Sequence, residues 1–241
     1  MKRLFAVMVV FVLAVGMVLP AAGQSEAPEG VFYGTWPYVL PPDHSLNSFS
    51  PNGPTTNLGN LFWSYVELPA AIYNWGTQEY VGLLAESWGF SDDNTYYEIN
   101  LKPGALWSNG DAVTSEDVVD TYAIGRILGW SQFNYISDVQ AVDEDTVHFI
   151  FSGEPSVVAE RLLLKQNIAD RATYGELAQR ALELVASGAA KDSEEWTTLN
   201  TDITSFAPAE LIASGPYTYT LDDVGDAFMT MRWQPNSIYS G

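Results

Sequence analysis

The sequence lacks cysteine and has few positive charges, and these absences exclude several classes of protein. Without cysteine there can be no disulfides, no thiolate nucleophile and no Cys-ligated zinc. The two histidines, His44 and His148, are too few for a site that needs three imidazoles. Lys and Arg number 10 against 30 Asp and Glu, and none lies between Arg3 and Lys102. A formal charge of −20 repels nucleic acids, so no nucleic acid is expected as a partner.

What is present is typical of a folded globular protein. Apolar residues make up 47% of the 241 residues, and eight residues are Trp. A chain of this length and composition forms one domain or two small ones around a hydrophobic core.

The first residues have the pattern of an export signal. Two basic residues precede an apolar run over residues 4–19, and the small residues at 20–23 suit a signal peptidase. We predict a signal peptide over 1–23 and a mature chain over 24–241. The apolar run is shorter than the ~20 residues that cross a bilayer, and no Cys follows it for lipid attachment. The predicted location is therefore periplasmic or extracellular.

Alternating apolar residues predict several strands. Tyr97, Ile99 and Leu101 alternate with polar residues, which is typical of a half-buried strand. We expect strands over residues 31–36, 95–101, 146–151 and 217–220, the last paired with 227–233. Because helical segments are interspersed with them, the predicted class is α/β, with a mixed β-sheet flanked by helices.

Capping residues and apolar spacing predict the helices. Thr114, with Asp117 three positions later, is typical of a helix start, and the T-Y-G-E sequence at 173–176 is a second candidate capping box. We expect helices over residues 58–73, from Thr114 through Ile127, and over 156–164, 173–187 and 193–204.

Three segments carry longer motifs. Residues 84–96 contain L-A-E-S-W and S-D-D-N-T-Y, and residues 101–119 read L-K-P-G-A-L-W-S-N-G-D-A-V-T-S-E-D-V-V. Residues 214–217 read S-G-P-Y, and R-W-Q-P-N-S-I-Y-S-G closes the chain. In this order they resemble the signatures of extracellular solute-binding proteins of ABC importers, in the class of oligopeptide, nickel and cello-oligosaccharide binders (family 5). We expect the motif residues to have structural roles rather than to form a ligand site. They form turns and a helix cap, and their two tryptophans, Trp88 and Trp107, are expected in the core.

The resemblance implies a lobe of the periplasmic-binding-protein type II kind. Proteins of this family are about twice as long as this chain, and two lobes joined by crossing strands close on the ligand. The chain is therefore expected to be an amino-terminal fragment with most of the first lobe, the second lobe missing. The resemblance further implies a monomeric, non-catalytic receptor that captures a solute and delivers it to permease subunits. No cofactor or metal is expected, because His44 alone of the two histidines lies in a loop suited to a ligand. The resemblance places a hinge at Ser214, Gly215 and Pro216.

The residues themselves suggest ligand contacts. Indole rings stack on sugar rings or peptide side chains and donate hydrogen bonds, so we predict ligand binding by Trp36, Trp63 and Trp130, with Asn47 as a polar contact. An oligosaccharide is favoured because the segment between Arg3 and Lys102 has no Lys or Arg to hold a carboxylate. An oligopeptide is the alternative, because its amino terminus could pair with an acidic side chain such as Asp43.

Two other classes of function are open from composition alone. A secreted glycoside hydrolase needs only two carboxylates and a Trp-lined groove, but no acidic pair stands in a recognisable motif. Serine catalysis is disfavoured because no G-x-S-x-G sequence is present. A cell-surface interaction protein would need only export and an acidic surface. We therefore predict no catalytic residue.

Overall fold

The computed structural model describes residues 34–35, 40–226 and 228–240. The predicted signal peptide and Trp36 lie outside the described residues. Every element below belongs to the compact unit Val39–Gly241. None of the described helices has both the length and the hydropathy needed to cross a membrane.

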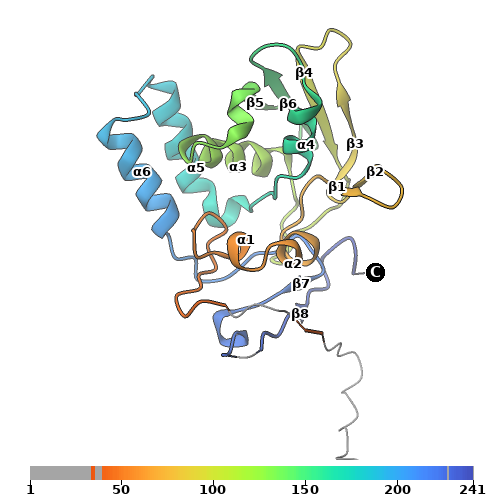
Figure 1. Cartoon of the computed structure of the whole chain (residues 1–241), viewed down its shortest axis with the longest axis vertical. Helices are drawn as coiled ribbons and strands as arrows, with labels where there is room; N and C mark the ends of the chain where they lie inside the picture. Colours follow the sequence, from red (N-terminus) through yellow and green to blue (C-terminus); the bar gives the residue numbers. More distant parts are fainter. Residues whose placement is uncertain (1–33, 36–39, 227, 241) are drawn as a thin grey trace, which may run out of the picture. The chain divides into compact units, whose positions relative to one another are not determined.

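The largest sheet has four strands (Figure 1). They are β3 (Ala85–Phe90), β4 (Tyr96–Leu101), β5 (Ile136–Ala141) and β6 (Thr146–Phe151), in the spatial order β3-β4-β6-β5. All three neighbouring pairs are antiparallel. The strands predicted at 95–101 and 146–151 are thus confirmed.

One face of this sheet forms the main hydrophobic core. Tyr97 is paired with Phe149 across β4 and β6, and Ile99 is paired with Val147. All four side chains are at most 2% exposed, while the residues between them are partly exposed. The alternation of apolar and polar residues in the sequence therefore predicts which side chains of these strands are buried.

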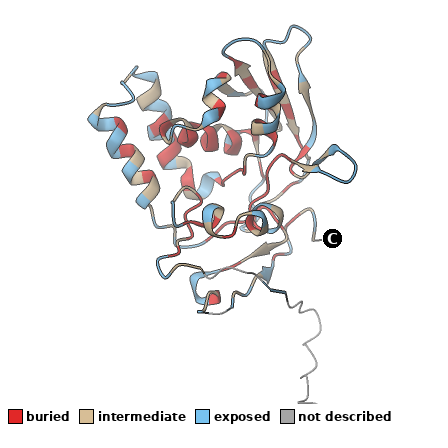
Figure 2. Ribbon diagram, in the orientation of Figure 1, coloured by how far each residue is buried: buried red, intermediate tan, exposed pale blue. Residues whose placement is uncertain are grey.

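Helix α3 (Ser115–Ile127) lies between this sheet and α5 (Arg171–Ala186) (Figure 1). It begins as predicted, because the N–H of Thr114 donates to Asp117 Oδ2 at 2.7 Å. Most of its residues are buried (Figure 2), since β5 and β6 cover one side while α5 and α6 (Glu194–Ser205) cover the other. A helix that is buried all round needs no polar face.

The other predicted helices are present with one corrected start. Helix α4 (Val157–Leu164) is capped by Ser156, and α6 is capped by Ser193. The capping box predicted at 173–176 is wrong, because Asp170 is the cap of α5 and its Oδ1 accepts from the N–H of Thr173 at 2.7 Å. Asp is among the preferred capping residues and also opposes the positive end of the helix dipole.

The helix expected over residues 58–73 is much shorter than predicted. Only α2 (Asn60–Tyr65) forms there, preceded by α1 (Pro54–Asn57) and followed by the antiparallel hairpin β1 (Ala71–Asn74) and β2 (Glu79–Gly82). After Tyr65 the backbone bonds with distant segments instead, because Leu68 O accepts from the N–H of Ile168 at 3.3 Å. Long-range pairing has overridden the helical spacing, and Pro69 cannot donate within a helix.

The remaining elements complete the predicted class. The strand predicted at 217–220 forms β7 (Tyr217–Thr218), paired as expected with β8 (Arg232–Trp233). Two short 3-10 helices are η1 (Ser131–Asn134) and η2 (Leu221–Asp223). Helices and sheets confirm the α/β lobe, but the described strands pair antiparallel throughout, so the sheet is not mixed in direction.

Candidate functional site

The predicted hinge residues are held against the segment that follows α2. The N–H of Gly215 donates to Val66 O at 2.8 Å, and Ser214 Oγ accepts from the N–H of Leu68 at 2.9 Å. A Cβ on residue 215 would overlap the carbonyl oxygen of Tyr65, so only glycine allows this approach. Two segments that are far apart in the sequence therefore meet here.

A third segment joins them from the carboxyl end of the described chain. Gln234 is buried, its Nε2 donates to Gly215 O at 2.8 Å, and its backbone N–H donates to Pro216 O at 2.9 Å. Ser237 Oγ donates to Ser214 O at 3.1 Å. We call the meeting of residues 63–68, 214–219 and 232–237 the junction.

Three aromatic side chains line the junction. Tyr65 is 43% exposed and Trp233 is 53% exposed, with the half-buried Tyr217 between them. The ring centroids of Tyr65 and Tyr217 are 6.1 Å apart, and those of Tyr217 and Trp233 are 5.8 Å apart. Both pairs meet edge to face, a favourable arrangement for aromatic rings. We call these three residues the aromatic row.

The junction contains a buried acidic residue. Glu67 is 2% exposed, and its Oε1 accepts from Ser48 Oγ at 3.0 Å. Burial raises the pKa of Glu67 well above its ordinary value, and among the described residues no cation pairs with it. Glu67 therefore lies in the junction as a buried group whose described side-chain partner is the Ser48 hydroxyl.

The charges beside the aromatic row cancel. Arg232 Nε donates to Asp223 Oδ2 at 3.0 Å, and a second guanidinium nitrogen pairs with Oδ1. This guanidinium lowers the pKa of Asp223 to about 2, so both groups are ionised at neutral pH. The row thus presents aromatic rings beside a closed ion pair, with no free carboxylate or cation among them.

The predicted ligand contacts are not brought together. Trp63, on α2, is 38% exposed but lies two positions from Tyr65, and residues at that spacing do not share a helix face. Trp130 packs on α3, where a Cβ on Gly125 would overlap its ring. Trp36 lies outside the described residues.

Asn47 has a structural position. It is fully buried, and its Nδ2 donates to Ile203 O at 2.8 Å and to Phe206 O at 3.0 Å. Its Oδ1 accepts from the N–H of Phe49 at 2.9 Å. These bonds tie the loop before α1 to the end of α6 and leave the side chain no exposed polar atom for a ligand.

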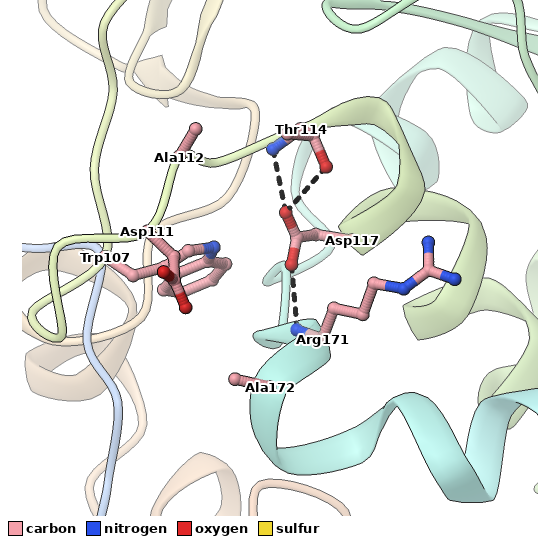
Figure 3. Close-up of a pocket in the computed structure, with 7 residues that line it drawn as sticks. All are labelled: Trp107, Asp111, Ala112, Thr114, Asp117, Arg171 and Ala172. Atoms are coloured by element: carbon pink, nitrogen blue, oxygen red, sulfur yellow. Dashed lines mark hydrogen bonds between the residues drawn. The ribbon is translucent and has the colours of Figure 1, made fainter.

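The residues of the long motif surround an open cavity of about 280 Å³ (Figure 3). One wall is Trp107, which is 2% exposed, as expected of a core residue. Asp117 accepts from the N–H groups of Thr114 and Arg171, while the Arg171 side chain pairs with Glu116. Because these polar groups already bond with one another, the cavity walls stabilise the fold. We call the segment from β3 through α3, residues 84–127, the motif core.

The aromatic row was not predicted from the sequence. The predicted pairing of 217–220 with 227–233 brings Trp233 near Tyr217, and the structure confirms that the two are register partners. Tyr65, in contrast, was expected inside the longer helix predicted over residues 58–73. Its position beside Tyr217 follows from the contact between residues 66 and 215, for which no local signal exists.

Among the described residues no three or more His, Asp and Glu come together as a metal site. His44 is buried, and its Nε2 lies 2.9 Å from Tyr219 Oη. Asn57 Nδ2 lies 3.0 Å from His44 Nδ1 and can only donate there, so Nε2 carries the proton toward Tyr219. His148 contacts Glu98 Oε2 at 2.9 Å on the outer face of the sheet.

Comparison with known proteins matches this arrangement to one family. The family model for bacterial extracellular solute-binding proteins, family 5 (Middle), matches residues 79–236. The peptidoglycan-binding protein YepA of Agrobacterium fabrum is 29% identical over 125 residues, which are 45% of this chain and 19% of YepA. A binding protein of Brucella melitensis is 30% identical over 103 residues, 39% of this chain and 17% of that protein.

Solved structures show the same fold. The periplasmic oligopeptide-binding protein of an ABC transporter from Thermotoga maritima superposes with a TM-score of 0.56 at 19% identity, over 79% of this chain and 31% of that one. Its mannohexaose-bound form gives 0.60 at 20% identity, over 82% and 32%. The chain therefore spans less than a third of each of these structures and at most 19% of the two curated relatives. With most of its residues matched by the family model, the chain belongs to the bacterial extracellular solute-binding proteins of family 5.

Proposed function

We propose that this chain supplies one wall of the solute cleft of an ABC-importer receptor, and that the solute is an uncharged oligomer, an oligosaccharide rather than an oligopeptide. Family 5 proteins are periplasmic or extracellular receptors that work with ABC importers. The aromatic row at the junction is the observation that carries the proposal for this chain. It lies beside Ser214, Gly215 and Pro216, the proposed hinge.

The chemistry of the row favours sugars. Partly exposed Tyr and Trp rings bury the C–H faces of sugar rings while their polar atoms accept or donate hydrogen bonds. Three rings that succeed one another at 6.1 and 5.8 Å provide several contacts along a chain-like ligand. A peptide also needs groups for its charged ends, and Arg232, the cation next to Trp233, is already paired with Asp223.

The proposed mechanism is binding without catalysis. An open receptor takes the solute on its aromatic wall, and closure at residues 214–216 covers the other face of the solute. Selectivity comes from the wall contacts, and burial of the solute stabilises the closed form, which docks on the permease. Trp63, which is 38% exposed on the same helix as Tyr65, is a further proposed contact.

The relatives are compatible with a sugar. The Thermotoga structure is named as a mannohexaose complex of an oligopeptide-binding protein, so this fold holds a sugar oligomer there. YepA is named for binding peptidoglycan, a polymer that contains sugars. Both are ligands of those proteins, and they motivate the choice of probes.

Calorimetric titration of the full chain tests the proposal. Mannohexaose and cellohexaose are compared with tetra-alanine and penta-alanine. Because the row contacts only one face of a solute, we expect weak sugar binding with a Kd of about 1 mM. We expect no binding of the peptides. Trp233→Ala should weaken sugar binding about tenfold through lost stacking.

Trp75→Ala is the matched control, because Trp75 is 74% exposed and lies on the β1–β2 hairpin outside the row. It should leave the sugar titration unchanged. If the chain bound the peptides but not the sugars, the proposed solute would be an oligopeptide instead of an oligosaccharide. Equal losses in the two Trp variants would remove the aromatic row as the solute wall.

A further inference from the structure

A second open cavity, of about 360 Å³, lies away from the junction. It is formed where α3 and α5 end, next to η1 and the start of β5. One wall is apolar and consists of Phe133, Ile136, Val185 and Trp196. The indole N–H of Trp196 donates to Ile127 O at 3.0 Å, so its ring is fixed in place.

The charged residues that line this cavity are both cations, Arg126 and Lys191. This is unusual in a chain with 30 acidic and 10 basic residues. Neither residue forms an ion pair within the described part of the chain. Asp138 acts on Arg126 electrostatically, but it neither lines the cavity nor lies within ion-pair distance.

The guanidinium of Arg126 is positioned by its neighbours. Its Cζ lies 4.4 Å from the centre of the Phe133 ring, and one terminal nitrogen donates to Ser137 O. A guanidinium has five N–H donors, so most of them remain for another partner. Burial lowers the pKa of Arg126, and an anion that pairs with it would offset this cost.

We propose that this cavity binds a small amphipathic carboxylate, whose carboxylate pairs with Arg126 and Lys191 and whose apolar body packs on Phe133 and Trp196. A planar guanidinium matches a carboxylate in two parallel hydrogen bonds. The exposed Ser152 adds a hydroxyl group at the rim, whereas the Ser137 hydroxyl already donates to Ile150 O at 3.4 Å. The site shares no residue with the aromatic row, so it stands apart from the proposed function.

The contrast with the motif-core cavity supports this assignment. There the lining cation, Arg171, pairs with Glu116 at 2.8 Å and lies 3.4 Å from Asp120. Its charge is therefore already neutralised within the fold. In the second cavity the positive charge has no such partner, and an apolar wall lies beside it.

Calorimetric titration of the full chain with 3-phenylpropionate tests the proposal, with 3-phenylpropanamide as the neutral analogue of the same shape. We expect the carboxylate to bind about tenfold or more tightly than the amide. The indole N–H signal of Trp196 in a nitrogen-correlated NMR spectrum should shift on binding. Lys191→Gln should weaken carboxylate binding about three- to tenfold, and Arg126→Gln should abolish it.

Lys165→Gln is the control, because Lys165 is an exposed cation on α4's carboxyl end, outside the cavity. It should leave binding unchanged. Lys191 is also exposed, so its variant stays informative should Arg126→Gln unfold the chain. Equal binding of acid and amide, no binding of either, or an equal loss in the Lys165 and Lys191 variants would each overturn the proposal.

Discussion

The motif core and the junction use their aromatic residues in opposite ways. In the motif core, Trp107 is 2% exposed and packs against the residues that begin α3. In the junction, Tyr65 and Trp233 are 43% and 53% exposed although the backbone beneath them is tightly bonded. The motif that identifies the family therefore stabilises the fold, and the surface suited to a solute forms where three distant segments meet.

The largest expected effect is a loss of stability in the motif core. Trp107→Ala removes a fully buried indole and leaves a cavity, so we expect the free energy of unfolding to fall by about 3–5 kcal/mol. Urea unfolding followed by circular dichroism measures this. Trp75→Ala, which truncates an exposed indole, should change it by about 0.5 kcal/mol or less. Similar losses in both variants would contradict the core assignment.

Gly215→Ala examines whether the backbone of the junction is as rigid as the motif core. The new methyl would overlap the carbonyl oxygen of Tyr65, which is held in place by the neighbouring hydrogen bonds. We expect a loss of about 1–3 kcal/mol in the same unfolding measurement. Gly89→Ala on β3 is the control, because its added methyl meets no atom within 4 Å. If Gly215→Ala were as stable as Gly89→Ala, the backbone of the junction would be able to move away from the added methyl group.

Two carboxylates, Asp120 and Asp223, contribute to the pH dependence of stability with opposite signs. Burial raises the pKa of Asp120, in α3, to about 6 from its ordinary 3.8. The folded state then binds more protons than the unfolded state between these values, so stability falls as pH rises from about 4 to 6. Asp223, in contrast, has its pKa lowered to about 2, so its contribution is lost as pH falls below about 4.

Melting temperatures between pH 2 and 8 check this, and we expect a maximum near pH 4 from these two groups. Asp120→Asn should flatten the fall above the maximum, because the amide does not ionise. Arg232→Gln should flatten the fall below it, because Asp223 loses its cation. A melting temperature that rises steadily from pH 4 to 7 would contradict the sign for Asp120.

A fold element was predictable from the sequence where the contacts that determine it are local. The alternation at 97–101 and the Thr114 cap are local, and both were confirmed. The helix expected over 58–73 failed because residues 66–68 bond to 168, 214 and 215, which the spacing of apolar residues does not encode. The predicted start of α5 was wrong for a local reason, because Asp170 rather than Thr173 caps the helix.

The candidate site was less predictable than the fold for the same reason. Asn47, chosen as a polar residue in an irregular loop, bonds to residues 203 and 206 at the end of α6. Trp130, predicted as a ligand contact, is fixed by close contact with Gly125. A tryptophan's exposure follows from which distant element lies beside it, and composition says only that eight are present.

Apart from the control variants, Trp233→Ala has the smallest expected effect on stability, and it sharpens the comparison most. Trp233 is more than half exposed and meets Tyr217 only edge to face, so its loss should cost about 1 kcal/mol or less in urea unfolding. The same variant should lose about tenfold in sugar affinity. Trp107→Ala, measured under conditions where the variant stays folded, should keep the sugar affinity. The indole of Trp107 is buried and cannot contact a solute. Truncating a core tryptophan would thus lower the free energy of unfolding and leave the sugar affinity unchanged. Truncating a junction tryptophan would lower the sugar affinity and change the free energy of unfolding little. If Trp233→Ala instead destabilised the chain as much as Trp107→Ala, the aromatic row would be part of the core, and the two regions would no longer differ.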